Sequence, residues 1–328
     1  MLKRLLIYCF TLLLSCSLFP INAHSDDGIL AGAFLRMGIG ARAMGMGGAF
    51  TAIADGPEAS YYNPGQLPFI NDHQLMASYR FLSLDRNFNY IGYAQSIKPK
   101  VDPDSEEQPF NGGLALSWIY AGVDKIDGRG LNGQPIGEFS NSENAFALSF
   151  GISPVRFVGI GINAKVLYNR FPEMKDDDSA LTDLSFGMDL GIMVKPLPYV
   201  SAGFMIKDMN AKYDWKTDKV WDKDIDKIDR FPKTYRGGVA FHLPSQRATF
   251  AFDIEKNDQQ DDARYHIGIE AIPVNGIALR AGINDGNFSG GAGYQFELMD
   301  RKIQIQYAMV TRDYDVAAEH IFTWLFSF

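Results

Sequence analysis

Few residues of this chain combine in a pattern that could catalyse a reaction. The five histidines are scattered, and no serine lies in the Gly-x-Ser-x-Gly pattern that exposes a nucleophile. The only cysteines, Cys9 and Cys16, lie within the first sixteen residues, so the rest of the chain has no thiol that could attack a substrate or bind zinc. The acidic run at 176–178 offers too few oxygens for calcium, and we interpret it as a hydrated loop tip. We therefore predict no enzyme, no cofactor and no metal site.

Three basic residues fall on the polar face of segments that alternate between apolar and polar side chains: Lys165, Arg236 and Arg280. Such cations could bind the carboxylate of an amphipathic ligand. They could also pair with acids on the same face of neighbouring segments, which are Asp189, Asp253, Glu270 and Glu297. Because an unpaired buried charge is costly, we favour pairing. His242 and His266 also fall on inward positions, whereas His320 falls on an outward one.

Residues 28–70 do not alternate and are rich in glycine and small apolar residues. The glycines do not form a phosphate-binding loop, because no strand–helix–strand unit follows them. Four larger residues stand among them and are candidates to line an apolar pocket: Met37, Met44, Met46 and Phe50. Methionine adapts to irregular apolar shapes, but simple packing against surrounding residues is the interpretation that we favour. Pro57 near a first turn predicts a helix that starts within residues 55–60.

From residue 73 to the end, apolar side chains recur at every second position. In residues 158–166 the apolar side chains alternate with glycine, asparagine and lysine, and residues 248–255 and 303–310 behave alike. Successive side chains of a strand point to opposite faces, so this period predicts strands with one apolar face. We expect fourteen, which span 73–84, 87–98, 110–122, 143–153, 156–169, 181–196, 199–208, 233–243, 247–256, 263–272, 276–284, 289–299, 301–312 and 316–328.

The connections between these strands separate a membrane barrel from a soluble sandwich. Several turns after even-numbered strands are tight, whereas long polar stretches at 124–142, 170–180 and 208–232 follow odd-numbered strands. Short turns at one rim and long loops at the other are typical of a transmembrane barrel. The last strand agrees, since His320, Phe322, Trp324, Phe326 and Phe328 share one face that suits lipid better than water. We therefore predict an all-β, transmembrane antiparallel β-barrel of about 14 strands, and hold a buried sandwich as the alternative.

The amino-terminal residues predict export. Lys3 and Arg4 precede an apolar stretch, and Ala23 closes a small-residue exit, which together indicate a signal peptide over residues 1–23. A lipoprotein signal with a lipidated Cys16 is the alternative. The remaining domains are then a segment at 24–72 and the barrel at 73–328. From the formal net charge of −8 we predict no nucleic-acid partner.

The amino-terminal segment carries a resemblance. Residues 40–49, with Gly40, Arg42, Gly45, Gly47 and Gly48, then Asp55, then residues 62–67 with Asn63 and Pro64, closely resemble the signature of PorV/PorQ-like proteins within the FadL group of outer-membrane transporters. Gly65 departs from the Asn-Pro-Ala of the FadL-like pattern. The resemblance implies that residues 24–72 form a hatch in the lumen, that the wall has an opening, and that the protein resides in the outer membrane of a Gram-negative-type bacterium.

Two functions follow from this resemblance. As in FadL, the barrel would take up or bind hydrophobic molecules such as long-chain fatty acids, with outer-membrane lipid around it. Alternatively, as in PorV, it would bind the signal domains of type IX secretion cargo. The loop at 208–232, which places Tyr213, Trp215 and Trp221 among alternating charges, would suit such a protein partner, although a solvated loop is the simpler interpretation. A purely structural barrel is the third possibility.

Overall fold

The computed structural model describes residues 30–53, 56–99, 110–173, 180–215, 227–244, 247–312 and 317–328, without the side chains of residues 172, 173 and 180. The predicted signal peptide, Asp55, Trp221 and residues 176–178 lie outside the described residues. What was expected of them stays a prediction.

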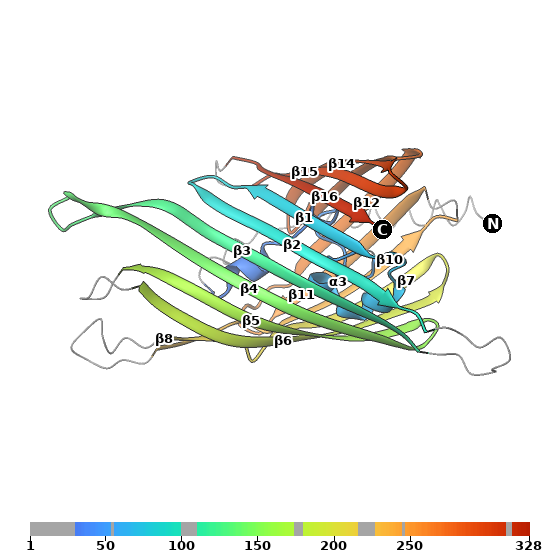
Figure 1. Ribbon diagram of the computed structural model, residues 1–328, viewed down its shortest axis with the longest axis horizontal. Helices are drawn as coiled ribbons and strands as arrows, with labels where there is room; N and C mark the ends of the chain where they lie inside the picture. The colour runs from blue at the N-terminus through green and yellow to red at the C-terminus, as the bar shows by residue number, and fades with distance from the viewer. Residues whose placement is uncertain are drawn as a thin grey trace.

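Within the described residues, fourteen antiparallel strands close into one barrel, which confirms the predicted fold (Figure 1). The strands are β1 (Gln74–Phe81), β2 (Arg86–Ile97), β3 (Asn111–Arg129), β4 (Pro135–Val155), β5 (Val158–Glu173), β6 (Ala180–Leu197), β7 (Val200–Met209), β10 (Thr234–His242), β11 (Ala248–Asn257), β12 (Arg264–Val274), β13 (Ile277–Asn284), β14 (Asn287–Leu298), β15 (Arg301–Val310) and β16 (Glu319–Ser327). β16 pairs with β1, from Gln74 opposite Ser327 to Phe81 opposite His320, and this pairing closes the wall.

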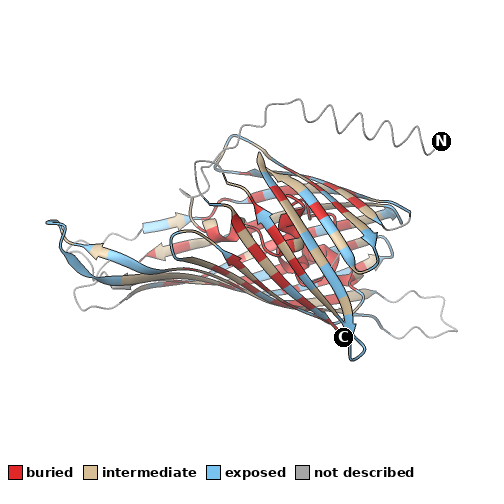
Figure 2. Ribbon diagram, turned by 90° about the horizontal axis from the view of Figure 1, so that it is seen from above, coloured by how far each residue is buried: buried red, intermediate tan, exposed pale blue. Residues whose placement is uncertain are grey.

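The two faces of the wall differ as the alternation predicts. Along β5, Ile160 and Ile162 are exposed, whereas Asn163 and Lys165 are buried. Buried and exposed residues alternate in this way along many of the wall strands (Figure 2). The outer face therefore presents apolar side chains, as a lipid-facing surface requires. Among the described residues, no helix is long and apolar enough to cross a membrane.

The strands are unequal in length. β3 and β4 run for 19 and 21 residues, whereas β13 runs for 8. The predicted ends of β3 and β4 were wrong, because most of the stretch expected to be a loop at 124–142 continues as a two-stranded ribbon, with Ile126 opposite Phe139. The apolar period fades in this ribbon while the backbone pairing continues. The pattern of side chains therefore predicted strands that are shorter than the observed β3 and β4.

Short helices occupy the interior of the barrel. They are η2 (Ala33–Arg36), α2 (Ala41–Gly45), α3 (Ala59–Tyr62) and η3 (Pro64–Phe69). α2 packs against β13–β16, and η3 packs against β2–β6. Residues 30–53 and 56–70, called the hatch below, are mostly buried (Figure 2). The helix expected to start within residues 55–60 is α3, which follows Glu58 as its N-cap.

Part of the loop expected at 208–232 is also folded. β8 (Lys212–Trp215) and β9 (Lys227–Arg230) form a separate two-stranded sheet at the end of β6. Tyr213 and Trp215 of β8 are buried at 4% and 7% exposure, so these aromatic side chains are not solvated, whereas most of β9 is exposed.

Candidate functional site

A single carboxylate fixes the middle of the hatch to the wall. Asp253 of β11 accepts hydrogen bonds through Oδ2 from the backbone N–H groups of Phe50 and Thr51, both at 3.0 Å, and from the Thr51 hydroxyl at 2.7 Å. Arg236 of β10 donates to the same oxygen at 3.0 Å and also to the carbonyl of Gly48. Because every donor is buried, breaking this carboxylate contact would leave polar groups unpaired inside the barrel.

A second ion-pair group holds α2. Arg42 donates to both oxygens of Glu270, at 2.9 and 2.8 Å, and Arg280 of β13 donates to Glu270 at 2.6 Å. Burial raises the pKa of the nearby Glu58 in the hatch, against the opposing effects of its own backbone N–H and of the Arg42 and Arg280 charges. Ion pairs and hydrogen bonds to charged side chains therefore hold the hatch against β10–β13.

A third charged group lies within the wall on the other side of the barrel. Lys165 of β5 pairs with Asp189 of β6 at 2.7 Å and also with Asp208 of β7. The β6–β7 register shifts at this point, so Asp208 adopts a φ of 60°, and its N–H donates to Asp189 at 2.8 Å. Asp189, Asp253 and Glu270 thus pair as expected, whereas Glu297 is exposed near the end of β14.

The hatch glycines allow close backbone contact with the wall. Gly47 has a φ of +64°, and a Cβ there would lie 2.4 Å from the carbonyl oxygen of Ile283. A side chain at this position would therefore be strained and would also clash. Gly40, Gly45 and Gly48 are buried in the same part of the hatch.

The Asn63–Pro64 turn fits the wall on the opposite side. Asn63 donates to the carbonyls of Thr51 at 3.0 Å and Ile192 of β6 at 2.9 Å, and accepts from the N–H of Gly65. A Cβ on Gly161 of β5 would lie 2.3 Å from the carbonyl carbon of Pro64. The hatch is thus seated against glycines on this side.

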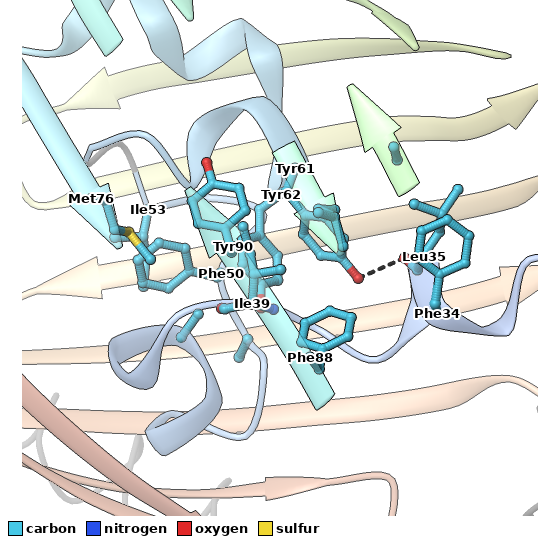
Figure 3. Close-up of a cluster of buried hydrophobic side chains, with 14 of the residues drawn as sticks. Phe34, Leu35, Ile39, Phe50, Ile53, Tyr61, Tyr62, Met76, Phe88 and Tyr90 are labelled. Carbon is cyan, nitrogen blue, oxygen red and sulfur yellow. Dashed lines mark hydrogen bonds between the residues drawn. The ribbon is translucent and has the colours of Figure 1, made fainter. Parts of the chain in front are cut away.

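The structure places the predicted apolar residues in two environments. Met46 and Phe50 belong to the central cluster, where the Phe50 and Tyr62 ring centroids are 5.3 Å apart (Figure 3). Met44 packs in a separate cluster with residues of β15 and β16. These three are at most 1% exposed, whereas Met37 is half-buried at the edge of the central cluster. The ligand-binding role of these residues stays a prediction.

An aromatic cluster lies where β8 and β9 meet the amino-terminal end of the hatch. Trp215 packs on Phe171 of β5 with ring centroids 5.0 Å apart, and Tyr213 packs on Phe231 at 4.7 Å. We call the side chains that share this region the outer cluster: Phe34, Leu35, Phe171, Leu181, Tyr213, Trp215 and Phe231. The sequence signal that pointed to it was the pair of aromatics in the 208–232 loop, but their inward direction was missed.

A small cavity lies beneath the outer cluster. It has a volume of about 20 Å³ and is lined by Leu35 and Tyr61 of the hatch and by residues of β3–β7, among them Ile119, Lys165 and Lys207. Tyr61 donates to the carbonyl of Leu35 at 2.7 Å (Figure 3). The volume suffices for little more than one water molecule. A second, polar cavity of about 180 Å³ lies between the hatch and residues of β1, β14, β15 and β16, at the end of the barrel that carries the short turns.

The histidines occupy separate environments. His266 is buried, and its Nδ1 lies 3.1 Å from the Gly47 carbonyl. His242 lies 3.4 Å from the Ser201 hydroxyl, and His320 stacks on Tyr307. Among the described residues, no three acidic, histidine or cysteine side chains come together in a metal-binding group.

Comparison with known proteins relates the chain by fold. No family model and no curated sequence matches it. Among solved structures, it resembles the toluene transporter TbuX of Ralstonia pickettii at a TM-score of 0.59 and 10% identity, covering 89% of this chain and 98% of that one. The toluene transporter TodX of Pseudomonas putida gives 0.56 and 14%, over 88% and 97%. A FadL homologue of Pseudomonas aeruginosa gives 0.51 and 11%, over 88% and 96%. The chain therefore has the fold of FadL-type barrels.

Proposed function

We propose that this protein admits small hydrophobic molecules through the bacterial outer membrane. The observation that carries the proposal is the outer cluster, in which aromatic and aliphatic side chains of the hatch, the wall and β8 pack together inside the barrel. A barrel for polar solutes would line this space with polar groups in contact with water. An apolar molecule gains free energy by leaving water for such a lining. Monoaromatic hydrocarbons fit the class, since the similar barrels TbuX and TodX are described as toluene transporters.

The hatch supports uptake by a gated route rather than an open pore. Its charged contacts with β10–β13 and its close contacts with wall glycines leave cavities of about 20 and 180 Å³. An entering molecule must therefore displace side chains of the outer cluster. We assign the ligand-facing role to Met37, which is half-buried at the edge of the central cluster, and a packing role to Met44, Met46 and Phe50.

The basic residues support a neutral ligand. Lys165, Arg236 and Arg280 each have a carboxylate partner within 3.0 Å. A ligand carboxylate would have to compete with these internal partners. We assign these three residues to the stability of the barrel rather than to ligand binding.

Uptake by intact cells tests the proposal, because a phospholipid vesicle is itself permeable to toluene. Entry of radiolabelled toluene and of radiolabelled glucose is compared between cells with and without the protein. We expect the protein to accelerate the entry of toluene and not of glucose. Equal acceleration of both solutes would indicate a general pore, and acceleration of neither would overturn the proposal.

Cell fractionation tests the location. A folded barrel migrates faster on a gel before boiling than after it, and we expect this band in the outer-membrane fraction. Recovery of the protein as a soluble periplasmic species would overturn the proposal. The PorV-like alternative predicts instead that deletion impairs cargo export while hydrocarbon uptake stays normal.

A further inference from the structure

One edge of β6 is free over its outer half. β6 pairs with β5 along its whole length, as far as Ala180 opposite Glu173. On its other side it pairs with β7 only from Met188 to Leu197, so among the described residues 180–187 have no wall partner there. Unpaired backbone groups are costly next to lipid, and closed barrels normally avoid them.

The outward side chains beside this edge are more exposed than those further along β6. Leu184 and Phe186 point outward and are 61% and 65% exposed. Further along the same strand, where β7 covers its side, the outward Leu190 and Ile192 are only 38% and 44% exposed.

β8 lies next to the free edge but is not paired with it. β8 contacts β6, yet the only ladder that includes it among the described residues is the one with β9. The Asp214 N–H donates to the Asp183 side chain at 3.0 Å, and a Cβ on Gly187 would lie 3.2 Å from the Ala211 Cβ.

This contact occurs at the position that a continued register predicts. The last β6–β7 pair is Met188 with Met209. Continued residue by residue, that register places Asp183 opposite Asp214, which are the two residues already joined by the hydrogen bond. It also places Phe186 opposite Ala211 and Leu184 opposite Tyr213. β8 is therefore aligned with the edge of β6 that lacks a partner.

Pairing would reverse the direction of the β8 side chains. Directly opposed residues of an antiparallel pair point to the same face of the sheet. Tyr213 and Trp215, which are now buried in the outer cluster, would then point outward beside Leu184 and Thr182. Lys212 and Asp214, which are now about two-fifths exposed, would point inward.

We propose that β8 has two positions: in the lumen, where it completes the outer cluster, and paired with β6, where it extends the wall and opens the outer lumen. This inference rests on the proposed uptake function only for its purpose, since the free edge and the register stand alone. In the lumen, β8 gains burial of two aromatic side chains and the hydrogen bond from Tyr213 to Glu143 at 2.9 Å. On the wall, it gains the ladder to β6, and its aromatic side chains join those near the membrane surface.

A hydrophobic ligand shifts β8 toward the position in which it is paired with β6. The ligand occupies the space that Tyr213 and Trp215 leave beside Phe34 and Phe171, and it therefore binds only the paired state. A ligand shifts an equilibrium toward the state that it binds more tightly. The substrate class thus acts as the signal that opens the lumen.

Two cysteine pairs trap the two positions in the otherwise complete chain. Phe186→Cys with Ala211→Cys places both thiols on the outer face only when β8 is paired with β6. The control, Gly187→Cys with Ala211→Cys, joins β8 to β6 in its present position, because the 3.2 Å between the Cβ sites is close to the spacing of about 3.5–4.5 Å in a disulfide. Cys9 and Cys16 lie in the predicted signal peptide, so the mature chain is expected to add no competing thiol.

We expect the control pair to cross-link almost completely under mild oxidation, and the Phe186 pair to cross-link partially and to increase at least about twofold with toluene. Absence of the Phe186 cross-link in a barrel that shows the normal heat-shifted gel band would overturn the proposal. A second readout avoids the substitution at residue 186: the fluorescence of Trp215, obtained as the difference from Trp215→Phe, should be quenched by brominated lipid more strongly when toluene is added. No increase in quenching would also overturn it.

Uptake assays separate this inference from the proposed function. If the cross-linked control pair loses toluene entry and reduction restores it, the two positions serve transport. If both cross-links form but toluene entry by the uncross-linked protein is unchanged by either, β8 moves as proposed and does not gate uptake. If both cross-links form and the protein shows no toluene entry even without a cross-link, β8 moves as proposed and the uptake function is wrong.

Discussion

The barrel has two sides that hold the same hatch by partly different means: close contact with glycines occurs on both, and the short side adds buried carboxylates. On the tall side, β3–β6 run for 16 to 21 residues, and the hatch contacts them through η3 and through glycines such as Gly161. On the short side, β10–β16 run for 8 to 12 residues, and the hatch is held by the carboxylates of Asp253 and Glu270.

The difference assigns separate tasks to the two sides. Buried ion pairs specify one position for the partners that they join, because displacement leaves charges unpaired in an apolar interior. Apolar and aromatic contacts depend little on direction, so a hydrocarbon ligand can replace a side chain in such a contact. The short side therefore anchors the hatch, while the outer cluster on the tall side is the part that a ligand can rearrange.

The largest expected effect comes from removing the anchor. Asp253→Ala leaves Arg236 buried beside the vacated site and frees the N–H groups of Phe50 and Thr51, so we expect a loss of about 3–5 kcal/mol in unfolding free energy. The measurement is urea unfolding in detergent, followed by tryptophan fluorescence. Asp253→Asn is the control and should lose less, because it retains an acceptor. A hatch that stays protected from protease in Asp253→Ala would contradict the anchoring role of the short side.

Overpacking of the tall side should have the next largest effect. A methyl group on Gly161 would lie 2.3 Å from the Pro64 carbonyl carbon, so Gly161→Ala should cost roughly 1–3 kcal/mol. The same urea titration measures it. Gly237→Ala is the matched control, since its Cβ would find its nearest neighbour at 3.9 Å. Equal stability of the two variants would show that η3 is not held by close contact.

A smaller change is expected at the outer cluster. Tyr213→Phe removes the hydrogen bond to Glu143 but keeps the aromatic packing, so the lumen position of β8 should weaken by about 1 kcal/mol. Introduced with the Phe186 and Ala211 cysteine pair, it should raise the cross-linked fraction of that pair. A fall in the fraction would mean that this bond does not favour the lumen position.

The smallest effect concerns pH. Burial raises the pKa of Glu58 above its ordinary 4.5, so the folded protein retains a proton that the unfolded chain releases. Stability should then fall as the pH rises above 4.5, until the pKa of the folded state is passed. Glu58→Gln should reduce this fall, as urea titrations at several pH values will measure. A steeper fall in Glu58→Gln would mean that the Arg42 and Arg280 charges dominate over burial.

Much of the wall could be predicted because each strand residue carries its own signal. The alternation in residues 158–166 and 303–310 identified the strands, and it assigned Lys165 to the lumen because side-chain direction follows from position parity alone. The ion pairs of Asp189, Asp253 and Glu270 followed from the same parity and from the cost of unpaired charge. The strand ends at Arg129 and Pro135 did not, because a ribbon without an apolar face shows no period.

The contacts inside the barrel were harder to predict from the alternation of side chains. Glu319, which pairs with Arg80, and Asp208, which pairs with Lys165, were not expected as partners, because each pair joins residues distant in the sequence. Tyr213 and Trp215 were expected in a solvated or partner-binding loop. Their inward direction depends on a turn after Met209 that no local pattern reveals.

The sequence by itself determined that this chain forms strands with one apolar and one polar face, because a period of two leaves every second residue on each face. It also determined that residues 40–49 can pack closely, because glycine has no Cβ. Only the tertiary structure decided which wall strand meets which part of the hatch, where β7 ends short of β6, and that β8 lies aligned beside the exposed edge. These features depend on the register and length of every strand in the barrel. Register and length are fixed when the barrel closes, and no single segment of the sequence determines them.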